Sequence, residues 1–179
     1  MQPRDWLDRT APLLKRARLE RAAPGELFDA KLATPFAVLG IRTAGELVTH
    51  IEYLPRFVAA LAPQTKLAEK VCRQIERYVD DAQFEFTLKF EYRGTPFQQR
   101  VWQAIHAIPG GKTQTYLDIA RQIKSAPRAV GGACGANRLP LIIACHRVVA
   151  SGGIGGFMHA RGGAPIEIKQ WLLRHENAR

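Results

Sequence analysis

The sequence predicts an α/β (α+β) protein, in which a small N-terminal α/β domain with a sheet is followed by a winged helix-turn-helix-like C-terminal domain. Three observations favour this fold class. Residues 27–54 contain β-rich apolar runs, residues 64–79 have the periodicity of a helix, and two short helical segments separated by a tight turn follow in the second half. We therefore divide the chain into an extension over residues 1–25, an α/β domain over residues 26–92 and a helical domain over residues 93–179.

The first domain is defined by three patterns of apolar residues. Residues 36–41 (FAVLGI) and Leu47–Leu54 (LVTHIEYL) are rich in aliphatic, β-branched and aromatic residues, and predict two strands joined by a turn. Over residues 84–92, aromatic and apolar side chains alternate with polar ones, which predicts a half-buried strand. A helix is expected over residues 64–79 because apolar side chains recur on one face, at Leu67, Val71, Ile75 and Tyr78.

The second half opens with a helix start. Thr95 can cap a helix, Pro96 suits the first helical position, and Gln98 completes a capping box. We expect this helix to continue to about His106, before Pro109-Gly-Gly breaks the chain.

Two further helices are expected over residues 115–124 and 126–136, with Ser125 as the cap of the second. A helix, a tight turn and a helix form a helix-turn-helix pattern. The second helix is unusual, because each interior glycine costs about 1 kcal/mol against alanine. Close approach of another helix or of a nucleic acid would offset that cost, and the spacing alone leaves both open. The glycines are Gly131, Gly132 and Gly135.

The charge of the chain is concentrated in this half. The whole chain has a net charge of +10, and residues 93–179 carry twelve Lys or Arg against three Asp or Glu, a net charge of +9. Phosphate backbones attract such surfaces, although a merely solvated basic face would have the same composition. No apolar stretch reaches transmembrane length and no signal peptide is recognisable, so we expect a cytoplasmic protein without membrane association.

Residues 139–149 (LPLIIACHRVV) hold the best candidate for chemistry. Their apolar run predicts a buried strand that ends on Cys145, with His146 beside it. A histidine next to a cysteine can generate the nucleophilic thiolate, although a buried cysteine can equally be inert core. The cysteines, Cys72, Cys134 and Cys145, are odd in number and lack paired metal spacing, which favours a reducing compartment, free thiols and no structural zinc.

Several ordered motifs in this half resemble the O6-alkylguanine-DNA alkyltransferases. They are Gly94-Thr-Pro-Phe-Gln-Gln-Arg-Val-Trp102, Thr115-Tyr-Leu-Asp-Ile-Ala120, Arg128-Ala-Val-Gly-Gly-Ala, Asn137, Cys145-His-Arg-Val-Val and Ile168-Lys-Gln-Trp-Leu-Leu-Arg-His-Glu176. They cover most of residues 93–179 in the family order, whereas the first half matches only in its layout of strands and helix.

The resemblance implies direct-reversal DNA repair without a cofactor or a metal. Cys145 would accept an alkyl group from O6-alkylguanine, or from O4-alkylthymine, in a single irreversible turnover. His146 would act as its base through a bound water, Glu176 would orient that histidine, and Asn137 would hold the turn before the active site. The implied partner is double-stranded DNA containing alkylated bases, and we expect a monomer.

The resemblance also implies a set of binding residues. Arg128 would enter the duplex in place of a flipped base, and Tyr116 would lie near the rotated phosphate and the guanine. An alkylated base stacked in DNA must be extruded before a thiol can reach it, at a cost of a few kcal/mol. Small residues on the recognition helix suit a minor groove, here Ala129, Gly131 and Gly132. The implied pocket residues are Val148, Phe157, Met158 and His159.

Three departures from the family pattern stand out. Ala144 replaces the usual proline. The stretch from Tyr116 to Arg128 is about two residues shorter than in the family, and the loop over residues 158–165 is about five residues longer. We expect the glycines of that loop to make a pliable pocket wall. The alternatives are an alkyltransferase-like protein that binds lesions without chemistry, a helix-turn-helix regulator and a cysteine hydrolase.

Overall fold

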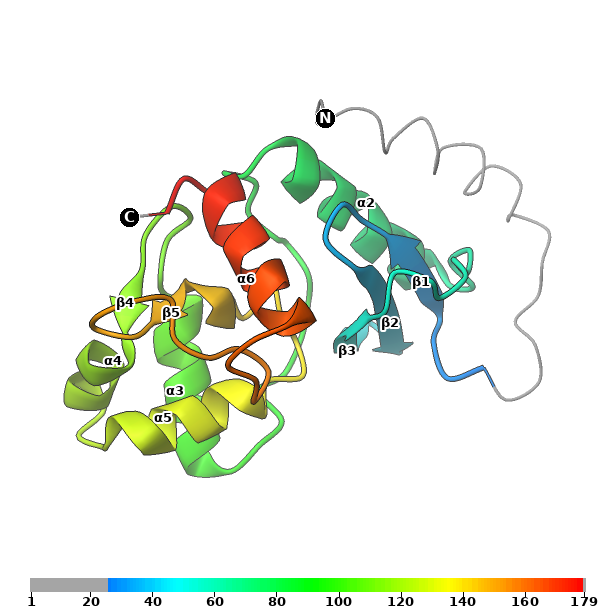
Figure 1. Cartoon of the computed structure of the whole chain (residues 1–179). Helices are drawn as coiled ribbons and strands as arrows, with labels where there is room; N and C mark the ends of the chain where they lie inside the picture. Colours follow the sequence, from blue (N-terminus) through cyan, green and yellow to red (C-terminus); the bar gives the residue numbers. More distant parts are fainter. Residues whose placement is uncertain (1–25, 179) are drawn as a thin grey trace. The chain divides into compact units, whose positions relative to one another are not determined.

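The computed structural model describes residues 26–178, so the extension predicted over residues 1–25 lies outside the described part (Figure 1). The chain forms two compact units, of which one ends at Glu91 and the other begins at Tyr92. Within residues 26–178, no helix is long and apolar enough to span a membrane.

The first unit contains a three-stranded antiparallel sheet. Its strands are β1 (Ala30–Ala33), β2 (Val38–Ala44) and β3 (Leu47–Leu54), in the order β1-β2-β3. The second predicted strand has the predicted bounds, whereas the first is shifted towards the C-terminus, since Phe36 and Ala37 precede it. Gly45 has a φ of +58° in the turn between β2 and β3, a conformation that favours glycine.

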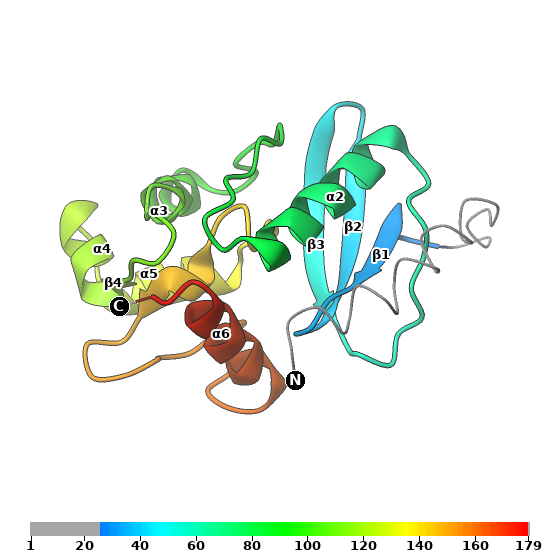
Figure 2. The same cartoon turned by 90° about the horizontal axis from the view of Figure 1, so that it is seen from above.

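Helix α2 (Lys66–Asp80) lies along this sheet, as Figure 2 shows. It begins where Thr65 caps it by accepting a hydrogen bond from the backbone N–H of Ala68. The helix predicted from the periodicity is therefore confirmed. Its buried face consists of Ala68, Val71, Cys72, Gln74, Ile75, Tyr78 and Val79.

The predicted strand over residues 84–92 is wrong. Burial does alternate along this segment, but only one residue pairs with the sheet, through a parallel bridge between Val48 and Phe90. The backbone N–H of Val48 donates to the carbonyl of Lys89 at 2.9 Å. The alternation reflects an extended segment lying on the unit, and a strand requires a continuous ladder that is missing here.

Helix α3 (Pro96–His106) starts the second unit at the predicted capping box. The Thr95 side chain accepts from the N–H of Gln98, and the Gln98 side chain accepts from the N–H of Thr95. Trp102 is buried and donates its indole N–H to the carbonyl of Ala133 at 2.8 Å, which fixes α3 against the helix that carries Ala133.

That helix is α5 (Pro127–Gly135), and with α4 (Tyr116–Gln122) it forms the predicted helix-turn-helix. The predicted cap at Ser125 is wrong: the N-cap residue is Ala126, whose methyl side chain cannot accept a hydrogen bond, and Pro127 takes the first helical position. Just before α4, β4 (Gln114–Thr115) pairs in parallel with β5 (Val148–Val149).

The predicted strand that ends on Cys145 is also wrong. The run is buried, but it forms turns, with Leu141 at a φ of +72°, and leads into the 3-10 helix η2 (Cys145–Arg147). A continuous apolar run indicates that a segment is buried, but it lacks the alternation that would identify the segment as a strand. The chain then passes through β5 and a long loop into helix α6 (Ala164–His175).

Candidate active site

A cavity of about 660 Å³ lies in the second unit between α5 and the loop that precedes α6. Cys145 contributes to its lining, together with residues from both ends of α5. The lining consists of Tyr116, Pro127, Arg128, Gly131, Cys134, Gly135, Cys145, Gly156, Phe157, Met158, His159, Ala160 and Arg161. Cys145 is only 7% exposed, so the thiol is accessible mainly through this cavity.

Asn137 connects the end of α5 to the thiol. Its Nδ2 donates to the carbonyl of Ile143 at 2.8 Å and to Sγ of Cys145 at 3.3 Å. Its Oδ1 accepts from the backbone N–H of Leu139 at 2.9 Å. One side chain thus holds the 137–145 turn and orients the sulfur.

His146 and Glu176 form a buried pair beside the cysteine. Nε2 of His146 lies 2.8 Å from Oε1 of Glu176, and the two residues are 1% and 2% exposed. Arg147 donates from Nε to Oε2 and from Nη2 to Oε1 of the same carboxylate, each at 2.9 Å. Such a two-pronged contact compensates the burial of the carboxylate charge.

These contacts set the charge states of the site. Burial raises the pKa of Glu176, but hydrogen bonds from His146 and Arg147 outweigh it and hold that pKa well below its usual range. Burial lowers the pKa of His146, which is therefore neutral at neutral pH. An ionised carboxylate can only accept, so the proton of His146 is on Nε2 and its lone pair is on Nδ1.

That lone pair is available for proton transfer. Nδ1 of His146 is buried and has no hydrogen-bond partner among the described residues. Burial raises the pKa of the Cys145 thiol, although Asn137 and Lys169 act in the opposite direction. The resting cysteine is therefore a thiol, and an adjacent base is needed to make it a nucleophile.

Lys169 belongs to this site, although we assigned it no role from the sequence. It is fully buried on α6, and its Nζ donates to the carbonyls of Val148 at 2.6 Å and Gly156 at 2.9 Å. Burial lowers its pKa to about 8. The signal in the sequence is a lysine on the inward face of a helix, between Ile166 and Leu172.

The predicted DNA-facing residues cluster on the helix-turn-helix. Arg128 is exposed and lines the cavity, as does Gly131, while Ala129 and Gly132 lie on the helix surface. A Cβ at Gly132 would meet nothing within 4 Å, so close packing within the protein does not explain this glycine. Tyr116 is half-buried in the cavity wall and donates its hydroxyl to the carbonyl of Gly156 at 3.0 Å.

The predicted pocket residues separate into two groups. Phe157, Met158 and His159 line the cavity, whereas Val148 does not and is instead fully buried on β5. Cys134, to which the sequence analysis gave no role, also lines the cavity. Gly162 and Gly163 are the glycines that we expected to make the pocket wall pliable, and neither of them lines the cavity.

The fold and this site define a class of protein in which a helix-turn-helix is combined with a reactive-site group of a cysteine, a histidine and a glutamate. These are Cys145, His146 and Glu176, and Asn137 links Cys145 to the end of α5, the second helix of the helix-turn-helix. Residues 96–178 match the family model described as "6-O-methylguanine DNA methyltransferase, DNA binding domain". The chain is 41% identical over 106 residues to the constitutive methylated-DNA–protein-cysteine methyltransferase of Bacillus subtilis. It is 47% identical over 91 residues to a probable methylated-DNA–protein-cysteine methyltransferase of Acanthamoeba polyphaga mimivirus.

Solved structures show the same fold. The O6-methylguanine methyltransferase of Mycobacterium tuberculosis has a TM-score of 0.70 and 32% identity, covering 82% of this chain and 90% of that one. OGT of the same organism in complex with DNA has a TM-score of 0.69 and 33% identity, covering 82% and 91%. The chain therefore belongs to the O6-methylguanine-DNA methyltransferase family.

The chain spans only about 60% of the length of these two curated relatives. The Bacillus match covers 58% of this chain and 62% of the relative, and the viral match covers 50% and 58%. The family model covers residues 96–178, the part of the chain that carries the helix-turn-helix and Cys145.

Proposed function

We propose that this protein repairs alkylated DNA by moving the alkyl group of O6-alkylguanine irreversibly onto Cys145. One observation carries the proposal: a buried thiol opens into a cavity beside a recognition helix, and a neutral histidine with a free Nδ1 lies next to it. Family membership supports the same chemistry, because the curated relatives are named as methylated-DNA–protein-cysteine methyltransferases.

The transfer is a single displacement. The thiol proton of Cys145 passes to Nδ1 of His146, through a water as the resemblance implies, while Glu176 stabilises the imidazolium that forms. Sulfur forms a bond to the alkyl carbon as the bond from that carbon to O6 breaks. The electron pair stays on guanine, which takes up a proton. The products are a stable thioether and an unmodified guanine, so each molecule acts once and needs no cofactor.

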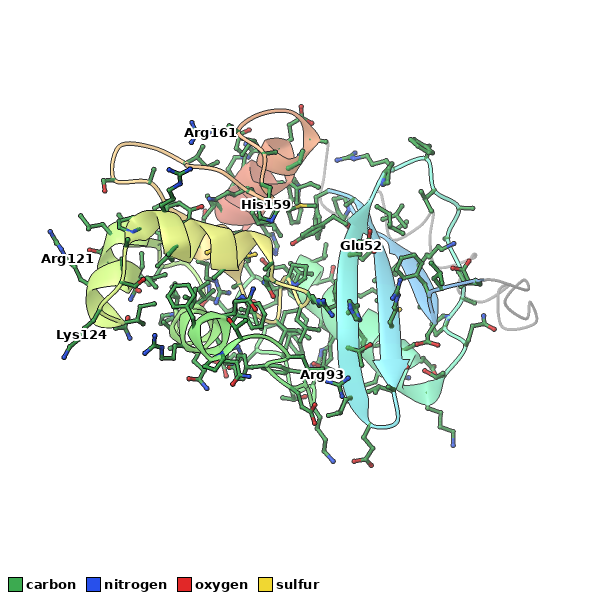
Figure 3. All side chains as sticks on the ribbon, turned by 90° about the horizontal axis from the view of Figure 1, so that it is seen from below. Glu52, Arg93, Arg121, Lys124, His159 and Arg161 are labelled. Atoms are coloured by element: carbon green, nitrogen blue, oxygen red, sulfur yellow. The ribbon has the colours of Figure 1, made fainter. Side chains whose placement is uncertain are left out.

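The substrate base reaches this thiol only when it leaves the duplex. Arg128, at the start of the recognition helix and on the cavity lining, fills the gap that the flipped base leaves. Arg121 and Lys124 project from the end of α4 and from the turn after it, as Figure 3 shows, and provide phosphate contacts near the same helix. Alkylated double-stranded DNA is therefore the proposed partner.

The remaining expectations follow from this chemistry. A protein that acts once on one lesion needs a single copy of the site, so we propose a monomer. The cysteines Cys72, Cys134 and Cys145 are all free, which fits a reducing cytoplasm. In a bacterium the protein would associate with the nucleoid.

The test is the stoichiometry of alkyl transfer. The full chain is incubated with excess duplex that contains O6-methylguanine labelled in the methyl group, and protein-bound label is counted. We expect one label per molecule, and none for Cys145→Ser. A protein that binds the lesion without acquiring label is a lesion binder, and label beyond one equivalent contradicts the single acceptor.

A further inference from the structure

A second thiol belongs to the cavity that holds Cys145. Cys134, near the end of α5, lines this cavity together with Cys145, and both cysteines are free. Cys134 is half-buried, so it remains accessible to a group held in the cavity. The proposed alkyl transfer uses only Cys145 and gives Cys134 no role.

Asn137 connects the two cysteines. Its backbone N–H donates to the carbonyl of Cys134 at 3.2 Å, and its side-chain Nδ2 donates to Sγ of Cys145 at 3.3 Å. One residue therefore spans the gap from the backbone of the first cysteine to the sulfur of the second.

The two thiols also share their electrostatic surroundings. Burial raises the pKa of the Cys134 thiol, a negative charge on Cys145 raises it further, and Lys169 acts in the opposite direction. Burial lowers the pKa of Lys169, whereas negative charge on either cysteine would raise it. Because Cys134 is held as a neutral thiol, it does not compete with Cys145 for the alkyl carbon of a lesion.

A neutral thiol nevertheless reacts with a stronger electrophile. When the alkyl group on Cys145 carries a leaving group on its second carbon, the new thioether sulfur can displace that leaving group. The product is a three-membered cyclic sulfonium ion, whose strained ring is opened by a nearby nucleophile. Cys134 is such a nucleophile in the same cavity.

We propose that Cys134 is a second acceptor site, which closes a two-carbon bridge to Cys145 when the lesion is an O6-(2-haloethyl)guanine. The proposal rests on the proposed function and extends it to lesions with two electrophilic carbons. The bridge removes the second electrophile inside the protein, before it reaches a nucleophile of the bound duplex.

The bridge forms in three displacements. The sulfur of Cys145 bonds to the first carbon as the bond to O6 breaks, and guanine takes up a proton. The same sulfur then bonds to the second carbon, and the halide leaves with the electron pair of the carbon–halogen bond. The sulfur of Cys134 attacks a ring carbon, the electron pair of the broken bond returns to the Cys145 sulfur, and the thiol proton of Cys134 passes to solvent.

A two-carbon bridge also suits this pair better than a disulfide. A disulfide requires sulfurs in direct contact and a narrow range of geometries, whereas two carbons span a larger gap.

The test maps the products formed with a freshly prepared duplex that contains O6-(2-chloroethyl)guanine. Trypsin cleaves after Arg138 and Arg147, so Cys134 and Cys145 fall in separate peptides, over residues 129–138 and 139–147. We expect these two peptides to be recovered joined by two carbons. The joined pair should exceed the Cys145 peptide carrying a hydroxyethyl group at least about tenfold, because a thiol held in place competes well against water.

Two variants and one substrate serve as controls. Cys134→Ser keeps the shape of the side chain but removes the thiol, so the group on Cys145 should end as hydroxyethyl or as a link to the duplex. Cys72→Ala changes the first unit only and should give the product ratio of the unaltered chain. A duplex with O6-ethylguanine, which has no leaving group, should give ethylated Cys145 and no joined peptides.

The outcomes distinguish this proposal from the proposed function. If the unaltered chain carries the hydroxyethyl group or a DNA link on Cys145 while Cys134 stays unmodified, the bridge is overturned and the proposed function stands. If Cys145 takes no ethyl group from the O6-ethylguanine duplex, both are overturned.

Discussion

Nε2 of His146 and Oε1 of Glu176 lie 2.8 Å apart in the interior, although thirty positions separate them in the sequence. Glu176 follows the last residue of α6, and His146 is in the 3-10 helix η2 that carries the cysteine. Arg147 binds the same carboxylate, which keeps Glu176 ionised and lets His146 remain a neutral base. The end of the C-terminal helix thereby sets the proton position at the active site.

Replacing Glu176 by glutamine should slow alkyl transfer about a hundredfold, within the usual contribution of an oriented base. The amide keeps the shape of the side chain but cannot stabilise an imidazolium, and the tautomer of His146 is no longer fixed. Single-turnover transfer from an O6-methylguanine duplex measures the effect. Glu167→Gln, an exposed change on the same helix, is the control. Equal rates for both variants would show that Glu176 is only structural.

The stability of the protein should fall on acidification, in two stages. The pKa of His146 lies below its ordinary 6.5 and that of Glu176 below its ordinary 4.5, so the unfolded chain binds more protons than the native one at both groups. Their contribution is complete above about pH 6.5 and is lost as pH falls, first through His146 and then, below about pH 4.5, through Glu176.

Urea denaturation across this pH range, with the unaltered chain and His146→Gln, measures the first stage. The variant should be less stable at neutral pH but should lose less stability between pH 6.5 and about pH 5. Parallel pH profiles for the two proteins would mean that His146 has an unshifted pKa.

Changing Asn137 to aspartate should keep one contact of the turn, lose the donor to the Ile143 carbonyl and impair the nucleophile. An aspartate can still accept the N–H of Leu139, but it places a negative charge where Nδ2 now donates to Sγ of Cys145. We expect the pKa of the thiol to rise, and alkylation of Cys145 by iodoacetamide to shift to higher pH. Asn137→Ala, which loses all three contacts, should instead be unstable. An unshifted profile in Asn137→Asp would exclude the contact with sulfur as a determinant of reactivity.

Removing Arg128 should affect duplex DNA far more than a free base. Arg128 is exposed and lines the cavity, whereas His146 and Glu176 are buried outside the lining, so we expect Arg128→Ala to leave the chemistry in place. We expect at least a tenfold larger loss on duplex than on free O6-benzylguanine, because the flipped state costs a few kcal/mol to form. Arg174→Ala, an exposed arginine of α6 outside the cavity lining, should behave as the unaltered chain. Equal losses on both substrates would place Arg128 in the chemical step.

Patterns among residues close together in the sequence were sufficient to predict the helices. The capping box at Thr95 and Gln98 and the apolar periodicity of α2 describe contacts between residues a few positions apart, and both are confirmed. The apolar run before Cys145 was misread as a strand, because its turns depend on Asn137, whose side chain bonds Leu139 and Ile143. A side chain that replaces backbone pairing leaves no periodic trace in the sequence.

The candidate site was predictable only where adjacent residues carry it. Cys145 and His146 are neighbours in the chain, whereas Glu176 was assigned from the resemblance alone. Lys169 was missed because its two carbonyl partners come from other segments, at Val148 and Gly156. His159 lies against Gly135 of α5 because the long loop before α6 folds back onto that helix, a contact that no local sequence pattern describes.

The most direct measurement of the central claim is peptide mass mapping after reaction. The full chain is reacted with a duplex that contains O6-methylguanine, digested, and its three cysteine-containing peptides are compared with those of unreacted protein. The account predicts one added methyl group, located on Cys145, with Cys72 and Cys134 unmodified. A methyl group on Cys134 or Cys72 instead, or none on any cysteine while the lesion disappears from the DNA, would contradict it.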